Sequence, residues 1–341
     1  MQAPFHFFTS VTRCSDLWTR SFEVAALPRA RWRTADFVVA EVVGMPNSLY
    51  RCETKTGRIA ELLAGDRIIG ALGERAATLE GVGSWRAVGD DGEMEALTGA
   101  GLLGRATSTS LLLPSFMRLR YLGHVQRDGR ALGMGDFVKP APSPGPAVPI
   151  VLVIGTSMSA GKTSSARVIV RELRALGLRV AAAKVTGAAR FRDILSFRDA
   201  GAREVFDFVD EGLPSTICPG EVFAPALERT LARISASGAD VVVIEAGASP
   251  LEPYNGDLAL ARIHGDTRMT VLCASDPYAV VGVQAAFGLQ PDVVSGPAAN
   301  TTAAVALVRR LAGVPALNLM DSDARPALRA MLIERFGTRE V

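Results

Sequence analysis

The sequence has 341 residues, of which 48% are hydrophobic and 21% are charged. This composition is typical of soluble globular proteins and excludes a chain that is disordered throughout, and the length is typical of about two domains. With 37 basic and 35 acidic residues the net charge is +2, and no apolar run is long enough to cross a bilayer, so we expect neither nucleic acid nor a membrane as a partner.

The N-terminal segment, MQAPFHFFTSVTRCSD, has neither the basic start nor the long apolar core of a secretory signal. The four cysteines are scattered without a CxxC pair, which indicates reduced thiols in a cytoplasmic protein. Because the chain has three histidines, we do not expect a histidine-based zinc or iron site. Mg²⁺ held by oxygen ligands is the metal that the composition favours.

Residues 1–138 are rich in short runs of strand-forming residues. ADFVVAEVVG (35–44), SLYRCET (48–54) and GDRIIGALG (65–73) are separated by turn residues, a pattern that predicts strands. EMEALTGAGLLGRA (93–106) is predicted to form a short helix and a glycine-rich turn. Together these segments predict a small β-rich α+β domain over residues 1–138.

Residues 139–149 read KPAPSPGPAVP and contain five prolines. This density of proline is incompatible with a helix and favours a stiff, extended spacer. We therefore predict that residues 139–149 are a linker between two domains.

After this segment, apolar runs of strand length alternate with amphipathic runs of helix length. Such alternation predicts a parallel sheet covered by helices on both faces over residues 150–341. In sheets of this kind, ligands bind at the carboxyl ends of the strands. The predicted strands are 150–155, 179–185, 240–246, 269–275, 292–296 and 315–319, and the predicted helices lie near 162–176, 221–237, 279–288 and 300–312.

The strongest functional motif is IVLVIGTSMSAGKTSS (150–165), in which an apolar strand and a loop of small residues precede a helix. This is the context of a P-loop, whose backbone N–H groups bind phosphate. Thr156 stands where the motif has its first glycine, with Gly155 one residue earlier. Lys162 is predicted to reach the phosphates and Thr163 to ligate Mg²⁺. The predicted cofactor-binding residues are Gly155, Thr156, Ser157, Ser159, Ala160, Gly161, Lys162, Thr163 and Ser164.

Two further acidic patterns are candidates for chemistry. DVVVIEA places Glu245 at the end of an apolar strand, where an acid can bind Mg²⁺ or orient a nucleophile. In RFRDILSFRDAGAREVFDFVDEGLPST (190–216), Asp207, Asp210 and Ser215 combine carboxylates with a hydroxyl, which suits an amine or hydroxyl substrate. The same acids are equally typical of ion pairs on a helix surface.

The loop GTSMSAGKT resembles that of dethiobiotin synthetase and its relatives. The resemblance implies that Lys184, in AAAKVTG, steadies a transferring phosphoryl or acyl group, and that Asp193 binds Mg²⁺. Ser157 replaces an aspartate of that family. It also stands where MinD-like dimeric ATPases carry an additional lysine, so a MinD-type switch is not favoured.

A second resemblance covers most of the chain. A poorly characterised bacterial and archaeal family joins a small N-terminal domain to a dethiobiotin-synthetase-like P-loop domain. Several segments of this sequence are similar to the pattern of that family. They are GTSMSAGKT, residues 184–187, Asp207-Phe208, Glu245 with Pro253-Tyr254, and GDRIIGALGERAATLEG near the N-terminus. The resemblance implies that Thr186 and Tyr254 contact substrate. Some members act in D-amino-acid metabolism, including N-acetylation of D-glutamate. Glu252 replaces a histidine of the family.

These observations predict a P-loop NTPase-type α/β enzyme with ATP and Mg²⁺ as cofactors. The leading hypothesis is phosphoryl transfer by a small-molecule kinase or a carboxylate-activating ligase, with Lys162, Lys184 and Glu245 as catalytic residues and Thr163, Asp193 and Glu245 at the metal. One alternative is an acyl-CoA-dependent N-acyltransferase whose P-loop holds CoA phosphates. Another is a nucleotide-gated regulatory protein or metallochaperone. We expect a small-molecule substrate and a homo-oligomer, either a dimer or a larger assembly.

Overall fold

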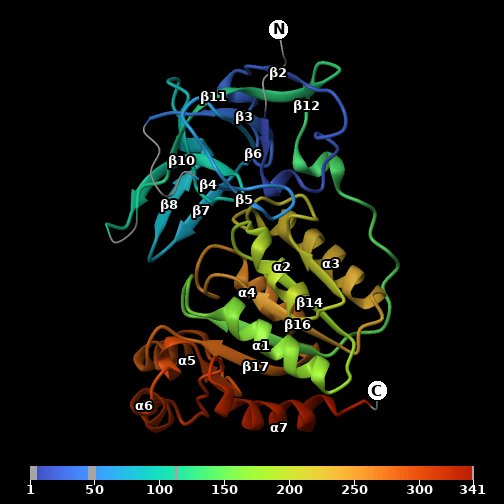
Figure 1. Cartoon of the computed structure of the whole chain (residues 1–341), viewed down its shortest axis with the longest axis vertical. Helices are drawn as coiled ribbons and strands as arrows, with labels where there is room; N and C mark the ends of the chain where they lie inside the picture. The colour runs from blue at the N-terminus through green and yellow to red at the C-terminus, as the bar shows by residue number, and fades with distance from the viewer. Residues whose placement is uncertain (1–5, 45–50, 112–113, 340–341) are drawn as a thin grey trace. The chain divides into compact units, whose positions relative to one another are not determined.

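The computed structural model describes residues 6–44, 51–111 and 114–339 (Figure 1). Residues 1–5 of the N-terminal segment and 48–50 of SLYRCET lie outside the described residues. The chain divides into two compact units. The first comprises Met1–Pro140 with Ala188–Arg192 and Phe208–Ile217, and the second comprises Ala141–Gly187, Asp193–Asp207 and Cys218–Val341.

The first unit is built almost entirely from strands and short 3-10 turns. Its strands are β1 (His6–Phe8), β2 (Glu23–Ala25), β3 (Phe37–Val42), β4 (Arg51–Glu53), β5 (Ile59–Glu61), β6 (Arg67–Leu72), β7 (Glu74–Ala77), β8 (Gly81–Ser84), β9 (Glu93–Ala96), β10 (Leu102–Thr109), β11 (Met117–Arg127) and β12 (Arg130–Ala131). Its 3-10 turns are η1 (Ser10–Thr12), η2 (Arg29–Arg31), η3 (Trp85–Ala87) and η4 (Met134–Phe137).

Within the described residues, ten of these strands form one sheet with the order β1-β6-β3-β11-β9-β10-β8-β7, to which β2 and β12 add by pairing with β11. A further pairing between β6 and β10 closes the path on itself. The inner face carries the core of the unit, because apolar side chains of β3, β6, β9, β10 and β11 all point to it. Val38, Ile68, Met94, Leu103 and Leu119 are each at most 1% exposed.

The helix predicted within residues 93–106 is wrong, because this segment forms strands β9 and β10. Met94 and Ala96 are buried, whereas Glu93 is exposed and Glu95 is partly exposed, which is the two-residue period of a strand. β9 pairs with both β10 and β11. The helix propensity of four residues is too weak to compete with pairing on both sides.

The second unit alternates strands and helices. Its strands are β13 (Ile150–Gly155), β14 (Val180–Thr186), β15 (Glu204–Asp207), β16 (Val241–Ala246), β17 (Thr267–Cys273) and β18 (Val293–Ser295). Its helices are α1 (Lys162–Ala175), α2 (Phe191–Asp199), α3 (Gly220–Ala236), α4 (Gly256–Ile263), α5 (Pro277–Phe287), α6 (Thr302–Ala312) and α7 (Arg325–Phe336), with 3-10 turns η5 (His264–Asp266), η6 (Pro297–Ala299) and η7 (Ser322–Ala324). The first two residues of α2 are assigned to the first unit.

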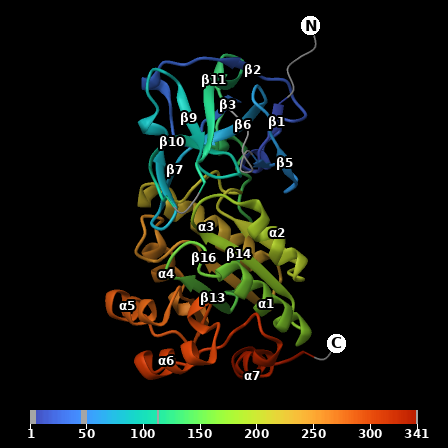
Figure 2. The same ribbon diagram turned by 60° about the vertical axis from the view of Figure 1, so that its left-hand side comes forward.

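The six strands of this unit, as described, form one parallel sheet in the order β15-β14-β16-β13-β17-β18. Helices lie on both sides of it, with α1 against α7 and α3 against α4 (Figures 1 and 2). Parallel pairing brings the carboxyl ends of β13, β14 and β16 to one edge of the sheet. The predicted fold class, a helix-flanked parallel sheet preceded by a β-rich region, is confirmed.

Not every element of the second unit was predicted. The expected strand 315–319 is wrong, since this segment contributes only a bridge between Val294 and Ala316. Pro315 has no N–H group to donate, and β18 is three residues long, so few ladder bonds are available. The elements that the sequence did not predict are α2, β15, α4 and α7.

Residues 139–149 contain neither helix nor strand, and residues 139–147 are exposed. The change from the first unit to the second falls between Pro140 and Ala141. Short segments from the second half of the chain also belong to the first unit, a feature that the sequence did not predict. The role of residues 139–149 as a linker stays a prediction.

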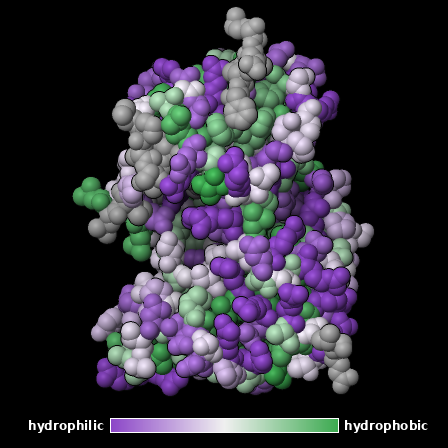
Figure 3. All heavy atoms as spheres, in the orientation of Figure 1, coloured by the Kyte–Doolittle hydropathy of each residue, from purple (hydrophilic) through white to green (hydrophobic). Residues whose placement is uncertain are grey.

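The described surface is polar with scattered apolar side chains. On the face shown in Figure 3, hydrophobic side chains are interspersed with hydrophilic ones. No helix among residues 6–44, 51–111 and 114–339 combines the length and the hydropathy that a membrane-spanning helix needs. The four cysteines, all within the described residues, are free thiols.

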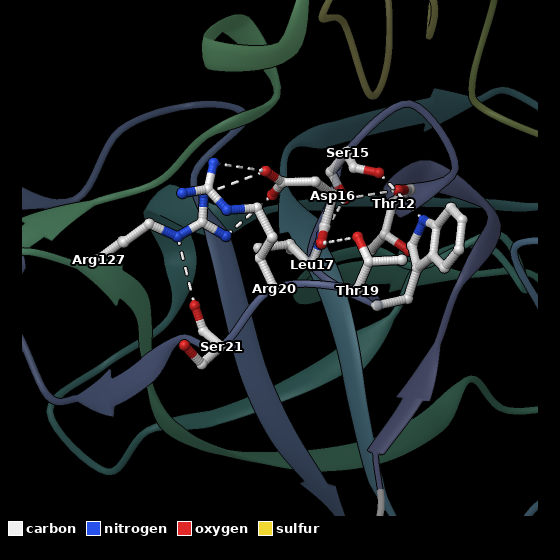
Figure 4. Close-up of polar contacts among 9 residues, drawn as sticks. Thr12, Ser15, Asp16, Leu17, Thr19, Arg20, Ser21 and Arg127 are labelled. Carbon is white, nitrogen blue, oxygen red and sulfur yellow. Dashed lines mark hydrogen bonds and ion pairs between the residues drawn. The ribbon is translucent and has the colours of Figure 1, made fainter.

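A bidentate ion pair joins the segment after η1 to β11 in the first unit (Figure 4). Asp16 accepts hydrogen bonds from Arg127, at 2.9 Å from Nη2 to Oδ1 and 3.3 Å from Nη1 to Oδ2. Arg20 adds a longer contact of 3.4 Å. The Arg127 hydrogen bonds hold the pKa of Asp16 below its ordinary value, so the folded state favours the ionised carboxylate.

We expect Asp16→Asn to lower the free energy of unfolding at neutral pH by at most about 1 kcal/mol, because the pair is partly exposed. Since the folded-state pKa is lowered, the wild-type advantage should be present above the ordinary aspartate pKa of 3.8. It should disappear as the pH falls through the lowered value. Urea denaturation of both proteins at neutral and strongly acidic pH measures this difference.

Asp128→Asn is the matched control, because Asp128 is exposed and forms no ion pair within the described structure. Its free energy of unfolding should differ from that of the wild type by the same small amount at both pH values. If the Asp16→Asn difference persisted at acidic pH, the contribution of Asp16 would not be ionic.

Candidate functional site

The predicted P-loop, residues 156–161, joins the end of β13 to the start of α1. Gly161 and Ser159 have positive φ angles of 92° and 63°, which turn the backbone sharply before the helix. Lys162 is 6% exposed, and its Nζ donates a hydrogen bond of 2.6 Å to the carbonyl oxygen of Ser157. Burial lowers the pKa of Lys162, while the charge of Glu245 opposes this shift. The loop therefore encloses its own lysine.

Gly155, one residue before the position of the motif's first glycine, lies against the lysine of the loop. A Cβ atom on Gly155 would lie 2.9 to 3.0 Å from the side chain of Lys162, so a larger residue there would displace the lysine. Thr156 fixes the loop instead: its N–H donates to the carbonyl of Cys273 and its Oγ1 accepts from the N–H of Ser275, both at 3.1 Å. The threonine thus ties the start of the loop to the end of β17.

Thr163 and Glu245 meet at the centre of this edge of the sheet. Glu245 lies beside Val153 in the register of β16 and β13, and its Oε2 accepts a hydrogen bond of 2.9 Å from the hydroxyl of Thr163. The carboxylate is 3% exposed. Burial raises its pKa, and the nearby Lys184 and Lys162 ammonium groups counteract that rise.

The donor set of this pair fits Mg²⁺. No three His, Cys, Asp or Glu side chains gather into a metal site in the part of the chain that the structure describes. Mg²⁺ does not require such a cage, because it usually takes one or two carboxylates and completes its shell with water and substrate phosphates. The Thr163 hydroxyl and the Glu245 carboxylate are the groups that would hold it.

Lys184 is the second buried lysine of the site. In the register of the sheet it lies between Glu245 on β16 and Asp207 on β15. Its Nζ donates a hydrogen bond of 2.6 Å to Oδ2 of Asp193, in the first turn of α2. Burial alone would lower its pKa, but Asp193 and Glu245 more than compensate, and the pKa is raised. The lysine is therefore a permanent cation held by carboxylates.

The loop after β16 is tied to the end of β14. The Thr186 hydroxyl donates to the Gly247 carbonyl at 2.9 Å, and the Gly247 N–H donates to the Thr186 carbonyl at 3.1 Å. Ser249 donates its N–H to Oε2 of Glu252 at 2.7 Å, and Tyr254 is fully buried. Thr186 therefore ties the loop after β16 to β14, and contact of Thr186 and Tyr254 with substrate stays a prediction.

The other predicted substrate residues fall into different units. Asp207 is 1% exposed at the end of β15, in the second unit. Asp210 and Ser215 belong to the first unit. Asp210 accepts from Arg13 at 2.9 Å and from the Cys14 thiol at 3.1 Å, and Ser215 Oγ accepts from the Ile217 N–H. Contact of Asp207, Asp210 and Ser215 with substrate stays a prediction.

Two residues of the site were not predicted. Glu252 is 8% exposed, and its charge slightly opposes the lowering of the Lys162 pKa that burial causes. The departure from a histidine in the resembling family was the sequence signal for this residue. Gly296 follows β18 with φ of 77°, and a Cβ there would lie 2.3 Å from the carbonyl oxygen of Ala160. It allows the segment after β18 to approach the P-loop.

No protein-family model and no curated protein sequence matches the chain. Among solved structures, it is similar to a DUF1611 family protein from Anabaena variabilis, with 16% identity over 61% of this chain and 65% of that protein and a TM-score of 0.39. This chain thus spans less than two thirds of that protein's length.

The chain is also similar to the cell division protein FtsY from Thermotoga maritima, with 16% identity over 57% of this chain and 71% of that chain and a TM-score of 0.38. For the 54 kDa signal recognition particle protein from Aeropyrum pernix in complex with GDP, the identity is 17%, the coverage 59% and 41%, and the TM-score 0.29. Every TM-score lies below 0.5, so these similarities carry no functional conclusion.

We expect Gly155→Ala to weaken binding of ATP or pyrophosphate by about tenfold or more, because the new Cβ displaces the Lys162 ammonium from its place in the loop. The atoms that it would meet belong to a flexible side chain, so the midpoint of thermal unfolding should stay near that of the wild type. Isothermal titration calorimetry and thermal melting measure the two effects.

Gly282→Ala, within α5, is the control, since a Cβ there meets nothing within 4 Å. It should leave the affinity unchanged and raise the stability slightly, because alanine is the better helix former. Unchanged affinity in Gly155→Ala would contradict the assigned role of this glycine.

Proposed function

We propose that this chain binds ATP with Mg²⁺ at the P-loop and transfers a phosphoryl group to a small carboxylate- or amine-bearing metabolite, as a kinase or a carboxylate-activating ligase. One observation carries the proposal: the hydroxyl of Thr163 and the buried carboxylate of Glu245 are 2.9 Å apart at the start of the helix that follows the phosphate-binding loop. This combination is the usual arrangement for a cation that bridges nucleotide phosphates.

The charges of the site support a metal-dependent reaction. Lys162 and Lys184 are both buried. The charges of Asp193, Glu245 and Asp207 act on Lys184, and the charge of Glu252 acts on Lys162. Burial raises the pKa of Glu245 and so disfavours its ionised form, although Lys184 and Lys162 oppose this shift. A bound divalent cation would neutralise phosphate oxygens and restore the favourable ionisation of that acid.

The chain's own residues then have distinct roles. Lys162 would exchange its hydrogen bond to the Ser157 carbonyl for one to a phosphate oxygen. The new hydrogen bond would be stronger, because both its donor and its acceptor are charged. Lys184 is held by Asp193 beside Glu245, where its fixed positive charge would stabilise the transferring group. The backbone of the P-loop would donate N–H groups to the phosphates.

An acyl-CoA-dependent N-acyltransferase would use the same loop for CoA phosphates but would not need a metal. The buried carboxylates would then be compensated by Lys184 and Lys162 alone and would repel the phosphates of CoA. The site thus favours the metal–nucleotide proposal, and the acyltransferase becomes an outcome of the test.

We expect the wild type to bind ATP in the presence of Mg²⁺, and Glu245→Gln to weaken that Mg²⁺-dependent binding by about 10- to 100-fold, because the metal loses an ionised ligand. Lys162→Ala should abolish turnover, because the variant lacks the ammonium group that would bind the phosphate oxygens. Calorimetric titrations with ATP–Mg²⁺, GTP–Mg²⁺ and acetyl-CoA, each with and without EDTA, provide the measurement, followed by assays of ADP or AMP release.

Glu228→Gln is the control, because Glu228 is an exposed acid on α3 that pairs with Arg262. It should behave as the wild type. Binding of acetyl-CoA that tolerates EDTA, together with release of free CoA thiol, would overturn the proposal in favour of acyl transfer. Binding of none of these ligands would remove both.

A further inference from the structure

Helix α2 begins without a local cap. The residue before Phe191 is Arg190, whose side chain has no acceptor for the free N–H groups of the first turn. Arg190 and Arg192 are both exposed and place positive charge at the positive end of the helix dipole, where it is unfavourable. The first turn of α2 therefore depends on a partner from elsewhere in the chain.

That partner is Glu53, the last residue of β4. Its Oε2 accepts from the N–H of Phe191 and its Oε1 from the N–H of Arg192, both at 2.7 Å. The hydroxyl of Ser10 donates to the same carboxylate at 2.6 Å. Glu53 is 2% exposed, and these residues all belong to the first unit. A buried carboxylate that accepts three hydrogen bonds is an unusually strong helix cap.

The next residue of this turn is Asp193, which binds Lys184 at 2.6 Å. Resting on the proposed function, we propose that Glu53 is a positioning residue for the nucleotide site: it fixes the first turn of α2 so that the Asp193 carboxylate meets Lys184 beside Glu245. Glu53 bonds only to the backbone of this turn, so it acts through Asp193 rather than on substrate.

The physical argument is geometric and electrostatic. Without the two N–H bonds, the first turn of α2 would fray, as uncapped helix ends do. The Asp193 carboxylate would then lose its fixed distance to Lys184, and the buried ammonium would lose its strongest partner. Glu245, which shares Lys184 with Asp193, would in turn face an altered charge.

The test uses the full chain with Glu53→Gln, Asp193→Asn and the double variant. Glutamine keeps the size of Glu53 but offers one neutral carbonyl oxygen in place of two charged carboxylate oxygens. It therefore cannot accept from both backbone N–H groups through charged acceptors. We expect amide hydrogen exchange across residues 191–195 of the ligand-free protein to accelerate about tenfold in Glu53→Gln. The Mg²⁺ concentration that half-saturates ATP binding should rise about tenfold in the same variant.

The double variant decides whether Glu53 acts through Asp193. If it does, Glu53→Gln should add nothing to the Mg²⁺ effect of Asp193→Asn, whereas independent effects would multiply. Glu172→Gln is the matched control. Glu172 is a carboxylate 3% exposed on α1 that pairs with Arg329 at 2.7 Å. Its loss should lower stability without changing the exchange of residues 191–195 or the Mg²⁺ dependence.

The outcomes separate this inference from the proposed function. Normal Mg²⁺ dependence or multiplicative effects in the double variant would overturn the role of Glu53 while leaving ATP binding established. If the wild type bound no ATP, the proposed function would fail. The exchange measurement would then still decide whether Glu53 holds the turn, and unchanged exchange in Glu53→Gln would overturn it.

Discussion

The burial of two lysines at the carboxyl edge of the parallel sheet is the constraint on which the rest of the second unit depends. A buried ammonium group is stable only when a carboxylate or carbonyl oxygen compensates it. Lys162 has the Ser157 carbonyl, and Lys184 has Asp193. The sheet order that places β14 and β13 on either side of β16 brings both lysines to the same acid, Glu245. The order of the strands therefore determines which charges meet at the site.

The central elements of this arrangement could be predicted from local sequence. IVLVIG has the continuous apolar pattern of a strand buried on both faces, and Gly161-Lys162-Thr163 follows it at the start of a helix, so the P-loop needed no distant information. Glu245 could be placed for the same reason, because it ends an apolar run. In parallel sheets such runs end at one edge, which brings their terminal residues together.

The parts that could not be predicted depend on partners far along the chain. Helix α2 has an arginine where a capping residue is expected and mixes charges with apolar residues, so its sequence carries no start signal. Its cap, Glu53, lies 138 positions away from Phe191. In the opposite direction, residues 93–96 have local helix propensity, but pairing on both sides makes them a strand. Tertiary partners decide the structure in both cases.

Under the proposed function, the hydrogen bond between Lys162 and the Ser157 carbonyl also affects how a phosphate ligand would bind. The ammonium group of Lys162 donates to the Ser157 carbonyl of its own loop, so the buried charge is not left unpaired. A phosphate must break that bond, and it can do so because it offers the ammonium a full negative charge instead of a carbonyl dipole. A neutral ligand offers no such compensation. Under the proposed function, the loop would therefore favour anionic ligands over neutral ones, and the carboxylates around Lys184 would favour phosphates that carry a divalent cation.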